Sequence, residues 1–105
     1  MKIEKRILNP DRVRRCPSQF SFIEHDLVRE GHLRRAEPKA WALYLVLITV
    51  GDEHGLSYYS DKSLGRLLSL DPEQIVIARR QLVAAGMIAY EDPLYQVLSL
   101  EGGRS

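Results

Sequence analysis

The sequence has 105 residues, of which 45% are hydrophobic and 28% are charged, and its formal net charge is +1. A chain of this length folds as one small domain, which excludes an enzyme built from separate cofactor and substrate domains. The composition excludes a disordered chain, and the longest apolar run, residues 40–50, is much shorter than the roughly 20 residues that span a bilayer.

Basic residues are concentrated at the N-terminus. Residues 1–15 hold six of them against two acidic residues, Glu4 and Asp11, whereas acidic residues outnumber basic ones in the rest of the chain. We therefore expect a basic arm, residues 1–17, attached to a mildly acidic domain, residues 18–105. The arm is either a solvated, frayed terminus or a contact for DNA phosphates. Its basic residues are Lys2, Lys5, Arg6, Arg12, Arg14 and Arg15.

The start of the chain and its cysteine content bear on its location. The N-terminus has no apolar stretch typical of a secretory signal. Cys16 is the only cysteine, so no intramolecular disulfide can form. Both features favour a cytoplasmic protein in a reducing compartment.

The first half of the domain predicts one short element and one long helix. Residues 20–22 alternate as in a short strand, and apolar residues such as Leu27 then recur at helical spacing until Gly31 offers a stop. We expect this segment to be a strand or short helix that packs the arm down. Pro38 favours a helix start, and the apolar residues that follow it up to Val50 predict a helix at the centre of the core.

The middle of the chain predicts a strand followed by two helices. Residues 56–59 are strand-like, and Ser60 can cap a helix that extends to about residue 69. The next helix has a strong start signal: Asp71 as N-cap, Pro72 at the first helical position, and Gln74 for a capping box. Gly86 is expected to end it in a left-handed conformation.

The C-terminal part predicts a β-hairpin, with strands over residues 87–90 and 95–100 and a turn that holds Pro93. The full order is helix, short strand, helix, tight turn, helix and hairpin. This order predicts an α+β, mainly α, fold: a winged helix-turn-helix with three core helices and a C-terminal β-hairpin wing.

A sequence resemblance supports this fold. Residues 63–90, SLGRLLSLDPEQIVIARRQLVAAGMIAY, resemble the common winged-helix pattern. Over nearly its full length the chain also resembles small bacterial winged-helix proteins associated with insertion sequences and other mobile elements. More distantly, it resembles the winged-helix domains of plasmid replication initiators and DnaD-type primosomal proteins. The segments that carry the closer resemblance are EKRILNPDRVRR, FSFIEHDLVR, LSYYSD, SLDPEQ and LVAAGMIAYEDPLYQVLSL.

The resemblance implies a regulatory or accessory role in replication, transposition or transcription, with duplex DNA as the partner. In such folds the outward face of the helix that begins near residue 72 meets the bases. Arginine can pair bidentately with guanine, and glutamine with adenine. The DNA-binding candidates in the domain are Lys62, Arg66, Gln74, Arg79, Arg80 and Gln81, in addition to the basic residues of the arm.

Other residues of the same region argue against strong binding through the helix. Asp71 and Glu73 occupy the first turn, where free N–H groups would otherwise help to bind a phosphate. The expected wing tip contains Glu91 and Asp92, which repel a phosphate backbone.

The alternative hypothesis is a protein interaction module without strong DNA binding. Val76, Ile77 and Val83 fall on the outward face of the helix, and grouped aliphatic residues on such a face often mark a protein contact. The partner would be the arm, a second copy of the chain, or a transposition or replication protein.

Catalysis and metal binding are not expected. The sequence has no Gly-rich phosphate loop, nucleophile elbow or paired-carboxylate motif, so we predict no enzyme activity, cofactor or small-molecule substrate. His25, His32, His54 and Cys16 lack the spacing of a zinc site, and the histidines are expected on the surface.

Overall fold

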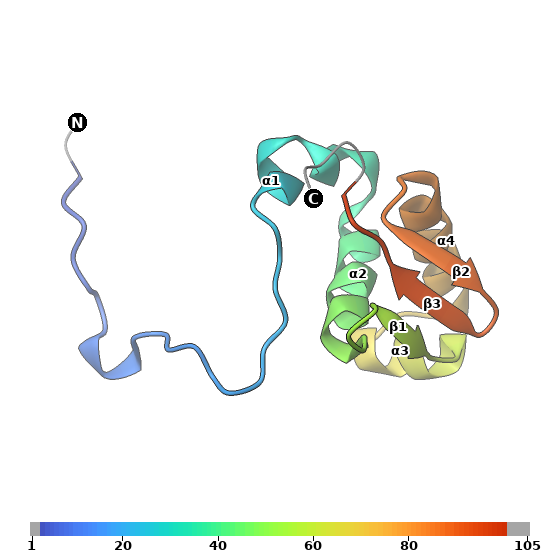
Figure 1. Ribbon diagram of the computed structural model, residues 1–105, viewed down its shortest axis with the longest axis horizontal. Coiled ribbons are helices and arrows are strands. Elements are labelled where there is room, and N and C mark those ends of the chain that lie inside the picture. The colour runs from blue at the N-terminus through green and yellow to red at the C-terminus, as the bar shows by residue number, and fades with distance from the viewer. Residues whose placement is uncertain (1–2, 101–105) are drawn as a thin grey trace.

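The computed structural model describes residues 3–100 and places a small folded domain beside an extended N-terminal stretch (Figure 1). None of the helices in this part of the chain has the length and apolar character of a membrane span. The elements in chain order are η1 (Pro10–Arg12), α1 (Asp26–Arg29), η2 (His32–Arg35), α2 (Pro38–Val50), β1 (Leu56–Tyr58), α3 (Asp61–Leu68), α4 (Pro72–Ala84), β2 (Ile88–Glu91) and β3 (Leu94–Val97).

Helix α2 is the centre of the core, as predicted. Pro38 occupies its first turn, and Gly51 follows its last residue, Val50. Leu43 and Leu47 are fully buried, because α2 packs against α3, α4 and β3. Since neighbours lie on several sides, a helix that is apolar around most of its circumference is stable here.

Helices α3 and α4 form the helix-turn-helix. The Ser60 hydroxyl accepts a hydrogen bond from the backbone N–H of Ser63 at 3.1 Å and so caps α3. At the start of α4, the Gln74 side chain accepts a hydrogen bond from the Asp71 N–H at 2.9 Å. Gly86 follows α4 with a φ of 75°, which confirms the predicted left-handed stop.

The turn between α3 and α4 depends on a close backbone approach at Gly65. The Leu70 N–H donates to the Gly65 carbonyl at 2.9 Å, and a Cβ at position 65 would lie only 2.5 Å from the Leu70 carbonyl oxygen. No other residue fits there without a shift of the backbone.

We therefore expect Gly65→Ala to destabilise the domain by about 1 to 3 kcal/mol, as overpacking does. The sign of the change in unfolding free energy distinguishes a tight turn from a loose one, because Gly to Ala inside an unconstrained helix stabilises by about 1 kcal/mol. Chemical denaturation of both proteins measures the difference. A more stable variant would show that the turn is looser than the structure indicates.

The wing is a three-stranded antiparallel sheet in the order β1-β3-β2. Strands β2 and β3 form the predicted hairpin, with Tyr90 opposite Tyr95 and a turn at Asp92 and Pro93, whose peptide bond is cis. Strand β1 pairs with the other edge of β3. The three main helices followed by this hairpin constitute a winged helix-turn-helix arrangement (Figure 1).

The segment before α2 differs from its prediction. Residues 20–22 form no strand, and Phe20 and Phe22 are exposed, because no sheet edge pairs with their backbone. Of the expected helix, one turn remains as α1, which buries Leu27. We call residues 18–25 the linker, because they connect the arm to α1. All of them are exposed, as is the described part of the arm. The arm is therefore not packed down, and it lies apart from the domain (Figure 1).

Candidate nucleic-acid interface

The outward face of α4 is the first candidate surface. Its inner face is as predicted, since Ile75, Ala78 and Leu82 are all buried. On the outward face Ile77 is 52% exposed, and Arg80 is exposed as well. This face therefore offers one cation, Arg80, among aliphatic side chains.

Arg79 belongs to α4, and its side chain contacts the start of α3 and the wing. Its Nη1 atom donates to Asp61 Oδ1 at 2.6 Å and to the Tyr95 hydroxyl at 2.9 Å, and its guanidinium lies 4.2 Å from the centroid of the Tyr90 ring. The Arg79 side chain is only 12% exposed. A guanidinium with these partners joins three elements of the fold, and reading a base would require it to leave them.

The titration behaviour of this cluster fits a structural role. Burial lowers the pKa of Arg79, but the hydrogen bonds to Asp61 and Tyr95 outweigh burial and raise the pKa above its ordinary value. Burial, together with the hydrogen bond from its hydroxyl to Asp92, raises the pKa of Tyr90 to about 12. All these hydroxyl and guanidinium protons are therefore retained near neutral pH.

Two glutamine candidates also have partners within the domain. The Gln81 side chain accepts a hydrogen bond from the Glu37 N–H at 2.7 Å and donates to the Glu37 carboxylate at 3.0 Å. It thereby satisfies a free N–H group at the start of α2. Gln74 caps α4, as described above. Arg35, which the sequence did not single out, donates to the Ala85 carbonyl at 3.1 Å and helps to fix the end of α4.

The remaining candidates are exposed cations. Lys62 and Arg66 lie one turn apart on α3, so they share one face of that helix. Lys2 lies outside the described residues. Within residues 3–100, ion pairs of basic side chains involve only His32, His54 and Arg79. The described cations of the arm, all of them exposed, are Lys5, Arg6, Arg12, Arg14 and Arg15.

The acidic residues that oppose phosphate binding are exposed. Asp71 and Glu73 lie at the start of α4, and Glu91 and Asp92 lie at the wing tip. A duplex seated on α4 and the wing would approach both pairs. The described part of the arm, residues 3–17, has two acidic residues, Glu4 and Asp11, against five basic ones. The largest concentration of available positive charge thus lies on the arm.

The histidines were expected on the surface, and this is wrong for His32. His32 is 4% exposed, and neither ring nitrogen has a hydrogen-bond partner within the described residues. His32 is the first residue of η2 and directly follows the left-handed Gly31. His25 and His54 are exposed as predicted. No group of three or more potential metal ligands occurs in residues 3–100.

The fold and the surfaces described above define a winged-helix protein with a basic, extended arm. Comparisons of the chain with known protein families, curated proteins and solved structures found no match.

Proposed function

We propose that this protein binds duplex DNA, with the arm supplying contacts to the phosphate backbone and α4 supplying limited contact to the bases. The observation that carries the proposal is the division of the cations into two groups. Arg79 is held by Asp61, Tyr95 and Tyr90 inside the domain. The described arm cations are exposed and have no ion-pair partner within residues 3–100.

The physical argument is electrostatic. Duplex DNA carries about one negative charge per 1.7 Å of helix axis, and cations that neutralise phosphates release condensed counterions. An extended chain rich in arginine can contact phosphates without a fixed docking geometry, and the N-terminal arms of homeodomains, a helix-turn-helix class, also carry arginines that contact DNA. Arg80, Lys62 and Arg66 remain available on the helix-turn-helix to orient the domain.

The biological role we propose is regulatory or accessory, in replication, transposition or transcription. It rests on the resemblance of the sequence to small winged-helix proteins of bacterial mobile elements. In this role the protein has no catalytic residues of its own, and its partners are duplex DNA and a transposition or replication protein.

Fluorescence anisotropy with a labelled duplex of random sequence, at several salt concentrations, tests the proposal. The expected result is binding that weakens steeply with salt, since each neutralised phosphate contributes a slope of about −0.9 to log affinity against log salt. If the full chain showed no binding to the duplex even at low salt, the proposed function would be wrong.

A second function is favoured by the aliphatic part of α4. Ile77 and Val83 of α4 are 52% and 45% exposed, and Val76, next to Ile77, is half-buried. Side chains of this kind on one helix face suit a protein contact, with Val76, Ile77 and Val83 as its centre. A stable complex that forms without DNA and resists salt would favour this interaction module over the DNA-binding protein.

A further inference from the structure

The arm carries large apolar side chains that its own domain does not cover. Ile3, Ile7 and Leu8 are 82%, 66% and 84% exposed. Glu4, Lys5 and Arg6 lie between Ile3 and Ile7, so residues 3–8 are apolar and carry a net charge of one positive unit. Binding to phosphates uses the cations alone and leaves these apolar side chains in water. Several such side chains within one short segment indicate a contact with another apolar surface.

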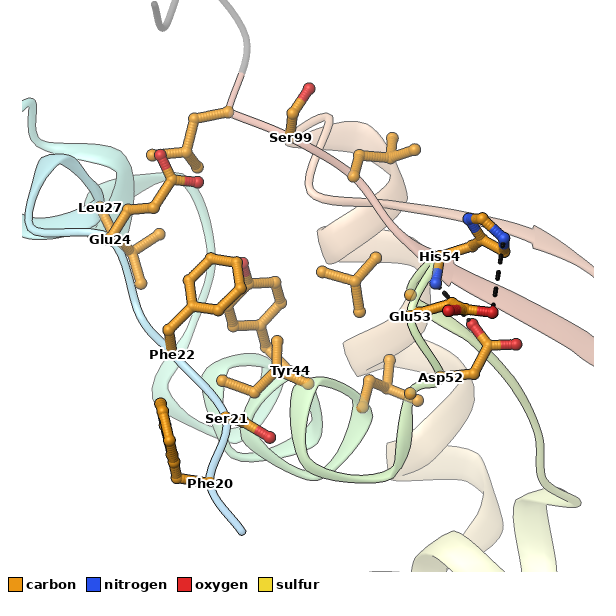
Figure 2. A pocket seen from close by; sticks show the side chains of 17 residues that line it. Phe20, Ser21, Phe22, Glu24, Leu27, Tyr44, Asp52, Glu53, His54 and Ser99 are labelled. Atoms are coloured by element: carbon orange, nitrogen blue, oxygen red, sulfur yellow. Dashed lines mark hydrogen bonds and ion pairs between the residues drawn. The ribbon is translucent and has the colours of Figure 1, made fainter. Parts of the chain in front are cut away.

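The domain contains a groove with matching chemistry. It is an open groove of about 610 Å³ between the linker, α2, the turn that follows α2, and the chain after β3 (Figure 2). Phe22 of the linker and Tyr44 of α2 both line this space (Figure 2). Other apolar residues that line the groove are Leu47, Ile48, Val97, Leu98 and Leu100.

The edges of the groove are acidic. Glu24 lies on one side, and Asp52 and Glu53 lie on the other (Figure 2). Hydrogen bonds from the backbone N–H groups of Leu56 and His54 lower the pKa of Asp52, so this carboxylate is ionised at neutral pH. An apolar floor between acidic edges fits a segment that is apolar and has a net positive charge. Residues 3–8 have both properties, since Lys5 and Arg6 outnumber Glu4.

Residues 3–8 do not reach this groove in their own chain. The linker runs along the groove through Phe20 and Phe22, and the chain then leads away, so that the arm lies apart from the domain (Figure 1). The groove and its complementary segment are thus both present in one chain but separated in space. In a second copy the same groove is open to an incoming arm.

We propose that two copies of the chain associate by exchanging arms, with residues 3–8 of each copy bound in the groove of the other. The interface is isologous, because each copy supplies one arm and one groove related by a two-fold axis. Ile3, Ile7 and Leu8 cover the apolar floor, while Lys5 and Arg6 face the acidic edges. Arg12, Arg14 and Arg15 lie outside the bound segment and stay available to DNA.

The first test is the molar mass of the full chain in the absence of DNA, measured by light scattering over a wide range of concentrations. We expect the wild type to reach the mass of two chains and the variant Ile7→Ser with Leu8→Ser to remain at one. Val28→Ser is the matched control, because Val28 is 63% exposed on α1 and does not line the groove. A wild type that stays monomeric at every concentration would overturn the proposal.

A second control separates this interface from the aliphatic face of α4. Ile77→Ser removes a side chain that is 52% exposed on α4 and does not line the groove. It should leave the dimer intact. Loss of the dimer in Ile77→Ser, with retention in the arm variant, would place the contact on α4 instead and contradict the arm exchange.

A charge exchange identifies the two contacting surfaces directly. One variant carries Lys5→Glu and Arg6→Glu in the arm, and the other carries Glu24→Lys and Glu53→Lys at the edges of the groove. Each alone pairs like charges and should be monomeric. In a mixture of the two variants, the acidic arm of the first meets the basic groove of the second, and the basic arm of the second meets the acidic groove of the first. A heterodimer should therefore form. Monomers in the mixture, or homodimers of either variant, would show that these surfaces do not meet.

These measurements are independent of the proposed DNA binding. They contain no DNA, and the serine variants keep every cation. A dimer that does not bind duplex DNA would support the arm exchange and contradict the proposed function. A strict monomer that binds duplex DNA would support the proposed function and contradict the arm exchange.

Discussion

Replacing Leu82 with alanine is expected to lower the free energy of unfolding by about 2 to 5 kcal/mol, as truncation of a core leucine does. Leu82 is fully buried on the inner face of α4, and α4 packs against both α2 and α3. The truncation removes apolar contacts and leaves a cavity in the buried core, and well-packed surroundings close such a cavity only in part. Urea denaturation followed by circular dichroism measures the loss.

Leu67→Ala is the matched control for this prediction. Leu67 is 59% exposed on α3, so the same chemical change there should alter stability by no more than about 0.5 kcal/mol. Equal unfolding midpoints for Leu82→Ala and Leu67→Ala would contradict the assignment of Leu82 to the core.

The fold was predictable because most of its signals are local. Pro38 marks the start of α2, the residues from Asp71 to Gln74 mark the start of α4, and Gly86 marks its stop. Each acts through backbone conformation or through hydrogen bonds within one helical turn. The helical spacing of Ile75, Ala78 and Leu82 then identified the buried face of α4 correctly.

The error at residues 20–22 has a different origin. Alternation shows only that a segment could form a strand with one apolar face, and a strand also needs a partner with free backbone groups. Residues 20–22 pair with no strand of the β1-β3-β2 sheet, and Phe20 and Phe22 line the groove beside α2 instead. The partner of a strand is a property of the tertiary structure, which the alternation of three residues does not contain.

The structural roles of Arg79 and Gln81 were not predicted for the same reason. Arg79 contacts Asp61 and Tyr95, 18 and 16 residues away in the sequence, and Gln81 contacts Glu37 across 44 residues. One signal was nevertheless present for Arg79. It follows Ile75 by four residues and precedes Leu82 by three, which places it at the border of the inner face of α4 rather than on the outward face.

The proposed function gives the acidic residues of α4 and the basic arm a joint explanation. Carboxylates in the first turn of α4 complement the helix dipole and stabilise the fold, at the expense of phosphate binding by that helix. In the proposed function, the basic arm adds cations for DNA apart from the acidic residues of α4, in addition to Lys62, Arg66 and Arg80 of the domain. Acidic residues in α4 then serve stability, and basic residues in the arm serve binding. The contribution of the arm can therefore be measured separately.

The triple variant Arg12→Gln, Arg14→Gln and Arg15→Gln should flatten the plot of log affinity against log salt by about 3 units, because three phosphate contacts at about 0.9 each are removed. Affinity at low salt should fall for every duplex alike, since phosphate contacts carry no sequence information. Ile3, Ile7 and Leu8 are unchanged in this variant, so its molar mass should equal that of the wild type. Anisotropy titrations of two unrelated duplexes at several salt concentrations provide all the slopes.

Two further variants make this result specific to the arm. Arg29→Gln, Arg34→Gln and Lys39→Gln remove the same charge from exposed positions of the domain and should leave the slope nearly unchanged. Arg80→Ala should cost about 1 to 3 kcal/mol on a preferred site and little on random DNA, if Arg80 contacts a base. If both triple variants flattened the slope equally, net charge rather than the arm would account for the binding. If neither did, the phosphates would be contacted by cations outside both sets, such as Lys5 and Arg6 of the arm or Lys62 and Arg66 of α3.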